Sequence, residues 1–426
     1  MSKQENNSLW SLTRNSIPEK MILSGDIRTD IAIIGGGYAG SSAALRLTEA
    51  GSDVTLIEAE YSGFGGSGRN VGLTNAGLWI NPEDVELAIG KKYGERLHEF
   101  LSAAPDLVYD LIEEHDIECD ALRNGTLHLA HSAAGLKAIE ERAWQINARG
   151  GRVMLLDKAA TYKLTAAENY LGAIHDMRAG TIQPLEYCHG LMVAAKKAGA
   201  TIYNGTPAQS IRHKRGKWHI KTPNGFLIAE RVLVATNAYI TNILPVVRNS
   251  FSTMYYSQMA TAPLSEEQLK HFLPGRNGTW DTRTIMRSFR TDAAGRLIIG
   301  TIGNIFKEDA PLFKSWANKV VEDTFPDVGS VEWTYKWSGK IACPKKFVPN
   351  LHDLGRGVYS ISGLSGRGIA PGTALGRSMA DYLLGRINST ELPLPMTTTQ
   401  PIAFNKFREL AFECGSQLSR IYDHLR

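Results

Sequence analysis

Residues 29–60 constrain the fold of this chain most, because the spacing of their apolar residues changes twice within a short stretch. Residues 31–34 form a continuous apolar run, which is typical of a strand buried on both faces. The pattern G-x-G-x-x-G follows at Gly35, Gly37 and Gly40, and it leads into an apolar helical face that ends near Gly51. A second apolar run then reaches Glu58. This order of strand, glycine turn, helix and strand predicts a βαβ unit with parallel strands.

The same residues predict a dinucleotide site. A tight turn at Gly35, room for a pyrophosphate at Gly37 and close helix packing at Gly40 are the separate tasks of such glycines. The helix N-terminus stabilises phosphate charge, and the Glu58 carboxylate can accept hydrogen bonds from ribose hydroxyls while it repels a 2′-phosphate. The predicted cofactor residues of this unit are Gly35, Gly37, Tyr38, Ala39, Gly40, Glu58 and Ala59.

Three later segments favour a flavin over a nicotinamide cofactor. They are a glycine-rich polar loop at 63–72, an apolar strand that ends in small residues at 235–237, and a strand followed by a glycine turn and a helix at 357–377. Each has a simpler alternative, namely a surface loop, a core strand and a packing turn. The cofactor residues they add are Gly65, Gly66, Ser67, Arg69, Asn70, Gly72, Leu73, Ala235, Thr236, Asn237, Gly363, Leu364, Ser365, Gly366, Arg367, Gly368 and Ile369.

Composition excludes several other classes of protein. Lys and Arg number 47 against 43 Asp and Glu, so the net charge of +4 demands no nucleic acid or other polyanion. The four cysteines include no C-x-x-C pair, which argues against a disulfide scaffold and a cysteine metal site. No apolar run reaches the roughly 18 residues that a membrane-spanning helix needs. A chain of 426 residues with these properties predicts a cytoplasmic protein of two or three domains, without a metal.

Six short segments, in order, resemble the D-amino-acid-oxidase-like (DAO) family of FAD-dependent oxidoreductases. They read SLW, GDIRTDIAIIGGGYAG, GSGRNVG, VLVATNAY, WSGK and GLSGRGIAPGTALG. The resemblance spans residues 8–390 and is greatest to the gamma-glutamylputrescine oxidase type. It implies a mixed α/β fold, with a glutathione-reductase-like Rossmann domain for FAD and an interleaved antiparallel-sheet substrate domain. It also adds Ala208 and Gly339 to the cofactor site, and it implies non-covalent FAD because Cys343 lies beyond the position near Trp337 that carries a covalent flavin in some relatives.

The cofactor-facing segments are far apart in sequence, so both predicted domains are discontinuous. We expect an N-terminal extension at 1–24, an FAD domain from 25–82, 145–245 and 340–388, a substrate domain from 83–144 and 246–339, and a C-terminal helical tail at 389–426.

The resemblance also indicates where a substrate meets the flavin. The candidates are Arg287 and Arg367 as binders of a substrate anion, Tyr256 and Trp337 as aromatic walls, and Lys340 as a further cation. Arg287 has an alternative role as an ordinary strand arginine, and the aromatic residues as sheet core. Ile298 occupies the position of the oxygen-activating lysine of some relatives.

These residues predict an oxidase that transfers a hydride from a small amine or amino-acid-like substrate to FAD and then reduces oxygen to hydrogen peroxide. The missing lysine leaves a dehydrogenase with a quinone or protein acceptor as an alternative. A flavin-binding protein without catalytic activity is the third hypothesis.

Overall fold

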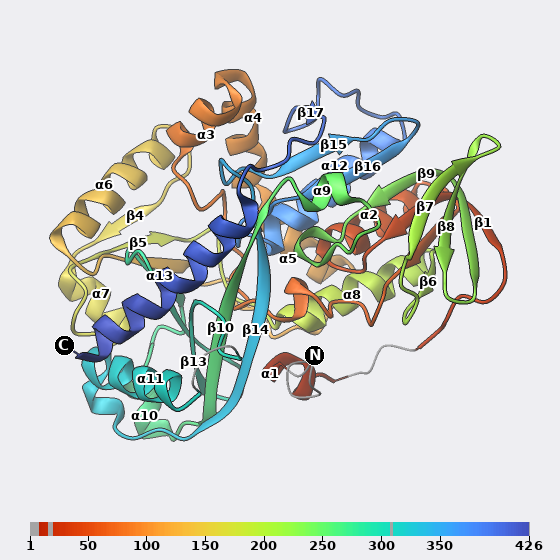
Figure 1. The fold of residues 1–426 in the computed structure, drawn as a ribbon. Helices are drawn as coiled ribbons and strands as arrows, with labels where there is room; N and C mark the ends of the chain where they lie inside the picture. Colours follow the sequence, from red (N-terminus) through yellow and green to blue (C-terminus); the bar gives the residue numbers. More distant parts are fainter. Residues whose placement is uncertain (1–7, 16–19, 307–309, 426) are drawn as a thin grey trace.

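Two β-sheets with helices packed on them organise the structure (Figure 1). The computed structural model describes residues 8–15, 20–306 and 310–425. In Figure 1 the first sheet lies at the right and the second at the left, behind the long helix α13 (Asn405–Leu425).

The first sheet is mostly parallel and contains the predicted βαβ unit. Its main strands, in spatial order, are β17 (Met396–Thr397), β15 (Asn350–Asp353), β16 (Val358–Ser362), β9 (Gly225–Val234), β1 (Ile27–Ile34), β2 (Val54–Ile57) and β6 (Thr201–Tyr203). The hairpin of β7 (Ser210–Lys214) and β8 (Lys217–Thr222) continues from β9. Ile34 pairs with Ile57 on one side and Val234 on the other, so the loops that follow β1, β2 and β9 leave the sheet at one edge.

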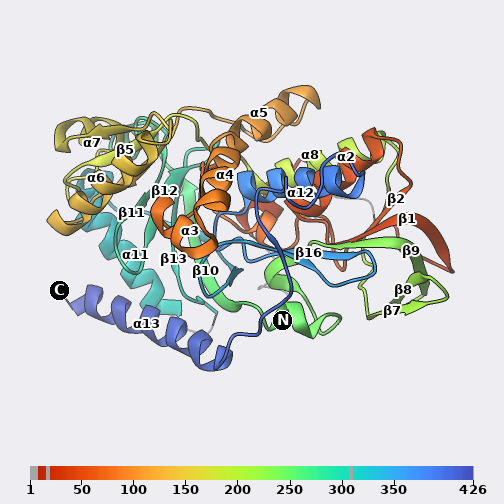
Figure 2. The same ribbon diagram turned by 90° about the horizontal axis from the view of Figure 1, so that it is seen from above.

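The apolar run of β1 is continuous because both of its faces are buried. Ile31 and Ile33 pack beneath the helices α2 (Tyr38–Glu49), α8 (Pro184–Lys197) and α12 (Ile369–Leu383), which Figure 2 shows together on one face of the sheet. Ala32 and Ile34 pack into the core on the opposite face, against the β8–β9 side.

The second sheet is antiparallel except where β11 pairs with β3. Its strands, in spatial order, are β14 (Trp333–Cys343), β10 (Ser252–Pro263), β13 (Arg296–Ile302), β12 (Arg287–Thr291), β11 (Gly278–Asp281), β3 (Thr126–Leu129), β5 (Ala173–Asp176) and β4 (Met154–Leu156). Phe313 and Trp316 of α11 (Ala310–Thr324) pack with Phe289 of β12, so α11 covers one face of this sheet. The other face is left for the cavity described below.

Shorter elements connect and brace the two sheets. They are α1 (Leu9–Leu12), α3 (Pro82–Ile89), α4 (Lys91–Ser102), α5 (Ala104–Glu114), α6 (Ala133–Asn147), α7 (Lys158–Thr165), α9 (Pro245–Arg248), α10 (Glu266–Lys270) and the 3-10 turns η2 (Gly66–Gly68), η3 (Asn237–Tyr239) and η4 (Pro326–Val328). Helix α13 is tied to β10 where Glu409 accepts a hydrogen bond from the Thr253 N–H (2.7 Å). Within the described residues, every helix is too short or too polar to cross a bilayer.

The mixed α/β architecture confirms the predicted fold class, whereas the domain boundaries differ from the prediction in three places. Strands β4 and β5, expected in the FAD domain, belong to the second sheet, where β5 pairs with β3 and β4 pairs with β5. Helices α3 to α5, expected in the substrate domain, pack into the core that contains β1 and α12. Strand β17 pairs with β15, so the region expected as a helical tail also extends the first sheet. In each case contacts between segments that are distant in sequence determine which domain an element belongs to, and the order of elements along the chain does not show these contacts.

Candidate active site

A cavity of about 360 Å³ is lined by residues of both sheets. One part, here called the nucleotide end, is formed by the loops after β1, β2 and β9. The other part, the sheet end, is formed by β10, β11, β12, residues 73–79 and the turn before α12.

The glycines of the first motif make room at the nucleotide end. Gly35 has φ +110°, and Gly37 is the extended N-cap residue of α2. A Cβ atom on Gly37 would lie 2.9 Å from Ser67 Oγ, and a Cβ atom on Gly40 would lie 1.9 Å from the carbonyl oxygen of Gly35. The backbone therefore leaves a cradle that side chains would fill, as a pyrophosphate-binding turn requires.

Glu58 is fixed beside this turn. One carboxylate oxygen accepts the Gly36 N–H (2.8 Å) and the other accepts the Glu60 N–H (3.1 Å). Burial raises the pKa of Glu58, and the backbone hydrogen bonds only partly oppose this. The half-buried carboxylate still lines the cavity together with Ala59 and Ala208, where it can accept ribose hydroxyls.

The glycine-rich loop is held by its own side chains and by the second sheet. The Asn70 amide donates to the carbonyls of Gly66 and Ser67 (both 2.9 Å). The Arg69 carbonyl accepts hydrogen bonds from Trp337 Nε1 (3.0 Å) and Gln258 Nε2 (2.6 Å). The predicted loop residues that line the cavity are Gly65, Gly66, Ser67, Arg69, Asn70 and Leu73.

Helix α1 and its N-cap residue Ser8 brace the same loop, a contact that was not predicted. Ser8 Oγ donates to the Gly68 carbonyl and Trp10 Nε1 donates to the Asn70 carbonyl (both 2.9 Å). Trp10 also meets Trp337 edge-on, with ring centroids 6.0 Å apart. Residues 8–10 therefore support the glycine-rich loop from behind the cavity wall.

The other two predicted cofactor segments are joined to each other. Asn237 Oδ1 accepts the Gly363 N–H (2.8 Å), which brings the end of β9 against the turn before α12. The predicted residues of these segments that line the cavity are Ala235, Thr236, Asn237, Leu364, Gly366, Arg367, Gly368 and Ile369, and the predicted Gly339 lines it from β14. Four predicted cofactor residues, Gly40, Gly72, Gly363 and Ser365, lie behind the cavity wall, where they shape the backbone.

A row of paired residues forms part of the sheet end. Across neighbouring strands, Gln258 pairs with Gly300, Gly300 with Ser288, Ser288 with Trp280, and Trp280 with His128. Tyr256 crosses above Gly300 and donates a hydrogen bond from its hydroxyl to Ser288 Oγ (2.7 Å). Burial raises the pKa of Tyr256, so this hydroxyl stays protonated at neutral pH.

Arg367 lies above this row. Its guanidinium carbon is 4.7 Å from the centre of the Trp280 ring, a cation–π arrangement. Burial and the neighbouring Arg142 lower the pKa of Arg367 to about 9, which still leaves the guanidinium charged at neutral pH.

The structure brings together three of the five predicted catalytic residues. Tyr256, Arg367 and Lys340 line the cavity, and burial with the nearby Arg248 and Arg69 lowers the pKa of Lys340. Arg287 does not line it, because alternation along β12 directs its side chain to the face covered by α11, with Cζ 5.9 Å from the Trp316 ring. Trp337 does not line it either, because it is fully buried under the Arg69 carbonyl.

Several residues of the sheet end were not predicted. Asn75, Trp79, Trp280, Met286 and Ser288 all line the cavity. Alternation along TIMRSFR places Met286 and Ser288 on one face of the strand and Arg287 on the other, so the sequence does show which of these residues lie together. The sequence does not show which of the two faces meets the cavity, because that depends on the packing of α11 and on the pairing of distant strands.

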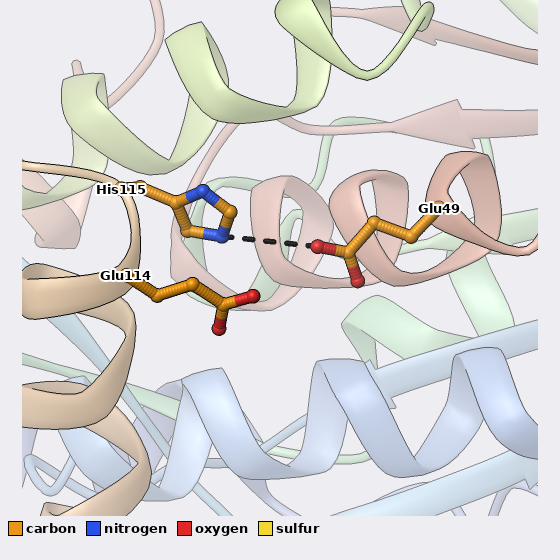
Figure 3. A group of neighbouring side chains, drawn as sticks. All are labelled: Glu49, Glu114 and His115. Atoms are coloured by element: carbon orange, nitrogen blue, oxygen red, sulfur yellow. Dashed lines mark ion pairs between the residues drawn. The ribbon is translucent and has the colours of Figure 1, made fainter.

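One further cluster contains residue types that can bind metals. Glu49, Glu114 and His115 come together where α2 and α5 end (Figure 3). His115 Nε2 lies 3.8 Å from a Glu49 oxygen, an ion-pair distance when the imidazole is protonated. Both glutamates are exposed, so a weak surface pair accounts for this arrangement.

Comparison with known proteins identifies the family. The family model described as FAD dependent oxidoreductase (DAO) matches residues 30–382. The chain is 32% identical over 390 residues to a probable oxidoreductase, OrdL, of Rhizobium meliloti (strain 1021), and 28% identical over 386 residues to the gamma-glutamylputrescine oxidoreductase of Escherichia coli (strain K12). Each alignment covers 90% of both chains.

A solved structure agrees in fold. The glycine oxidase of Geobacillus kaustophilus matches 88% of this chain and 100% of its own, with a TM-score of 0.71 and 21% sequence identity. The glycine cradle beside Glu58 fits the dinucleotide that the family model requires. The chain belongs to the DAO family of FAD-dependent oxidoreductases.

Proposed function

We propose that this enzyme oxidises the C–N bond of a small amine or amino-acid-like substrate and uses oxygen as its electron acceptor. The substrate loses a hydride from carbon and a proton from nitrogen and becomes an imine, which water splits into a carbonyl compound and an amine or ammonia. FAD, when bound, supplies the two-electron redox chemistry between substrate and oxygen. Oxygen takes up two electrons and two protons and leaves as hydrogen peroxide.

The observation that carries this proposal is that one cavity combines a glycine-rich nucleotide end with an aromatic sheet end. The nucleotide end offers glycine backbone and Glu58, whereas the sheet end offers Trp79, Trp280 and Tyr256. Trp79 and Tyr256 can contact an amine or methylamine group and exclude water from the reacting carbon, whereas the Trp280 ring already stacks with Arg367 and His128. The gamma-glutamylputrescine oxidoreductase and glycine oxidase among the relatives support an amine or amino-acid substrate.

The cavity residues divide into roles under this proposal. The predicted residues at the nucleotide end, in the glycine loop and in the turn before α12 hold FAD. The proposal includes non-covalent attachment, because Cys343, the cysteine that follows Trp337 on β14, is buried and does not line the cavity. Lys340 supplies positive charge toward the reduced cofactor and oxygen.

A different electron acceptor is the second candidate function. Ile298 is fully buried against Leu9, Trp10 and Trp337, so its position carries no cation for oxygen activation. An enzyme of this kind would pass electrons to a quinone or a protein carrier.

Two measurements on the FAD-bound enzyme test these functions. The first is anaerobic loss of the visible flavin absorbance with a panel of polyamines, amino acids, N-methyl amines and aminophosphonates. Reduction by one class supports amine oxidation, and failure of every class with FAD bound favours a flavin-binding protein without this activity. The second is reoxidation of the reduced enzyme by air or by an electron-accepting dye, since fast reaction with the dye alone favours the dehydrogenase.

A further inference from the structure

We infer that the outer side of α13 is the interface of a homodimer, in which α13 of one copy packs antiparallel on α13 of a second copy across a two-fold axis. This inference concerns how the chain assembles, so it holds or fails independently of the proposed function.

Exposed apolar side chains follow one side of α13, which Figure 2 shows along the edge of the molecule. The four large ones, Phe404, Phe407, Leu410 and Leu418, are 55–86% exposed. Two small exposed residues lie between them. Together these residues are called the outer strip: Phe404, Phe407, Leu410, Ala411, Cys414 and Leu418.

The opposite side of α13 already attaches the helix to the protein. Glu409 accepts hydrogen bonds from the Thr253 N–H (2.7 Å) and from the Arg248 guanidinium (3.0 Å). Phe412 packs against a core formed by β10, β13 and β14, and Ser416 is fully buried. A helix that rests on a protein with one side carries polar residues on its other side. The fold of the single chain therefore does not account for the outer strip.

The spacing of the outer strip indicates that its partner is a helix. Phe407, Ala411, Cys414 and Leu418 follow one another at intervals of four, three and four residues. This alternation of intervals keeps apolar side chains in line over about three helical turns, and it is the seam along which two helices pack lengthwise.

The same spacing fits a second α13. Phe407 and Leu418 are large and end this seam, whereas Ala411 and Cys414 are small and form its centre. The intervals are the same in both directions, so in an antiparallel pair Phe407 of one copy lies beside Leu418 of the other. The small residues then meet at the centre, where they let the helices approach. A two-fold axis requires a self-complementary surface of this kind, and the antiparallel arrangement brings opposite ends of the helix dipoles together.

Charge and area favour a second copy over a membrane or a nucleic acid. Among residues 403–418, Lys406 is the only exposed charged residue, whereas helices on anionic membranes and nucleic-acid surfaces present several cations. The large side chains of the outer strip expose about 500 Å² per copy, and about 1,000 Å² from two copies reaches the lower limit of a specific interface. An interface of this size predicts a dissociation constant of order 10 µM.

Sedimentation equilibrium of the FAD-bound enzyme tests the interface. The wild type should change from a monomer of 46.7 kDa to a dimer as its concentration rises from about 1 to 200 µM. Leu418→Glu should weaken association by at least about tenfold, because it places a carboxylate against Phe407 of the second copy. Leu87→Glu is the matched control, since Leu87 is 85% exposed on α3, and it should associate like the wild type. Both variants should keep the circular dichroism spectrum of the wild type, because both side chains are exposed.

Cys414 provides a second measurement, which locates the contact. Cys414 is exposed, and the other three cysteines are buried. Packed helices with axes about 8–10 Å apart place the two Cys414 Cα atoms about 10 Å apart in the proposed pair. A bismaleimide of that span should therefore link two copies covalently. Cys414→Ser should abolish the product, Leu418→Glu should reduce it in proportion to the loss of association, and Leu87→Glu should leave it unchanged.

Three results would overturn the inference. One is a monomer at every concentration up to about 200 µM, and another is equal association of the wild type and Leu418→Glu. The third is a dimer in which the bismaleimide does not link Cys414. Co-sedimentation with vesicles of phosphatidylcholine and phosphatidylglycerol tests the other occupant, since vesicle binding that Leu418→Glu abolishes, without a dimer in solution, would assign the outer strip to a lipid surface instead.

Discussion

Replacing Glu58 by alanine should weaken FAD binding by about 10- to 100-fold. The carboxylate accepts the N–H groups of Gly36 and Glu60 with or without FAD, so these two bonds largely cancel in the dissociation constant. The ribose hydroxyl bonds exist only in the complex. A hydrogen bond to a charged group contributes about 1.5–3 kcal/mol, and about 1.4 kcal/mol corresponds to a factor of ten in affinity.

Ionisation of Glu58 should change the stability of the protein and its affinity for FAD in opposite directions as pH rises. Because burial raises the pKa of Glu58, its contribution to the stability of the FAD-free protein is fully present below the unfolded pKa and is lost as pH rises through the folded pKa. FAD binding requires the ionised carboxylate as an acceptor. Affinity should therefore fall as pH decreases through the raised folded pKa, at a higher pH than for an ordinary glutamate.

The assay is a titration of FAD-free protein with FAD between pH 5 and 8, followed by quenching of flavin fluorescence. Glu58→Gln should remove most of the pH dependence, and Glu140→Ala, on the exposed side of α6, should leave affinity unchanged. A dissociation constant for Glu58→Ala within about threefold of the wild type would refute a ribose contact at this residue.

Three other substitutions test separate parts of the structure. Gly40→Ala should lower the free energy of unfolding by about 3 kcal/mol, because the new Cβ would meet the Gly35 carbonyl. Gly415→Ala, on α13, should raise the free energy of unfolding by roughly 0.5–1 kcal/mol, because its Cβ would meet no atom within 4 Å. Thermal denaturation measures both changes. Arg287→Gln should lower the melting temperature and leave the substrate KM unchanged, because the Arg287 side chain packs near Trp316. A raised KM without loss of stability would show that Arg287 contacts the substrate. Lys340→Met should slow reoxidation by oxygen by about tenfold and leave anaerobic reduction unchanged, and equal reoxidation rates would exclude Lys340 from oxygen activation.

The nucleotide end could be predicted because its determinants are close in sequence. Gly35, Gly37 and Glu58 belong to one βαβ unit, and hydrophobic period, turn chemistry and helix polarity all indicate the same arrangement. The loops after β9 and β16 also line the cavity, since parallel strands direct the loops at their carboxyl ends to one edge of the sheet, and their contact with FAD stays a prediction.

The sheet end could not be predicted to the same extent, because its determinants are distant pairings. Strand alternation divides β12 into two faces, but the packing of α11 decides that Ser288 and not Arg287 meets the cavity. Trp79 and Trp280 approach the turn before α12 from separate segments that show no periodic signal. The predicted boundary at residue 145 is wrong for the same reason, since β4 and β5 are short strands that join the second sheet only through the pairing of β5 with the upstream strand β3.

Gly300 shows how the fold and the sheet end depend on one residue. A glycine within a strand costs about 0.5–1 kcal/mol relative to alanine, and this one lies between two paired strands. A Cβ atom there would come within 2.6 Å of both Ser288 Oγ and the Tyr256 ring. Any side chain would therefore separate the tyrosine from the serine and release the hydroxyl that the tyrosine orients. The strand accepts a weaker residue at this position because only glycine lets the two side chains meet across it.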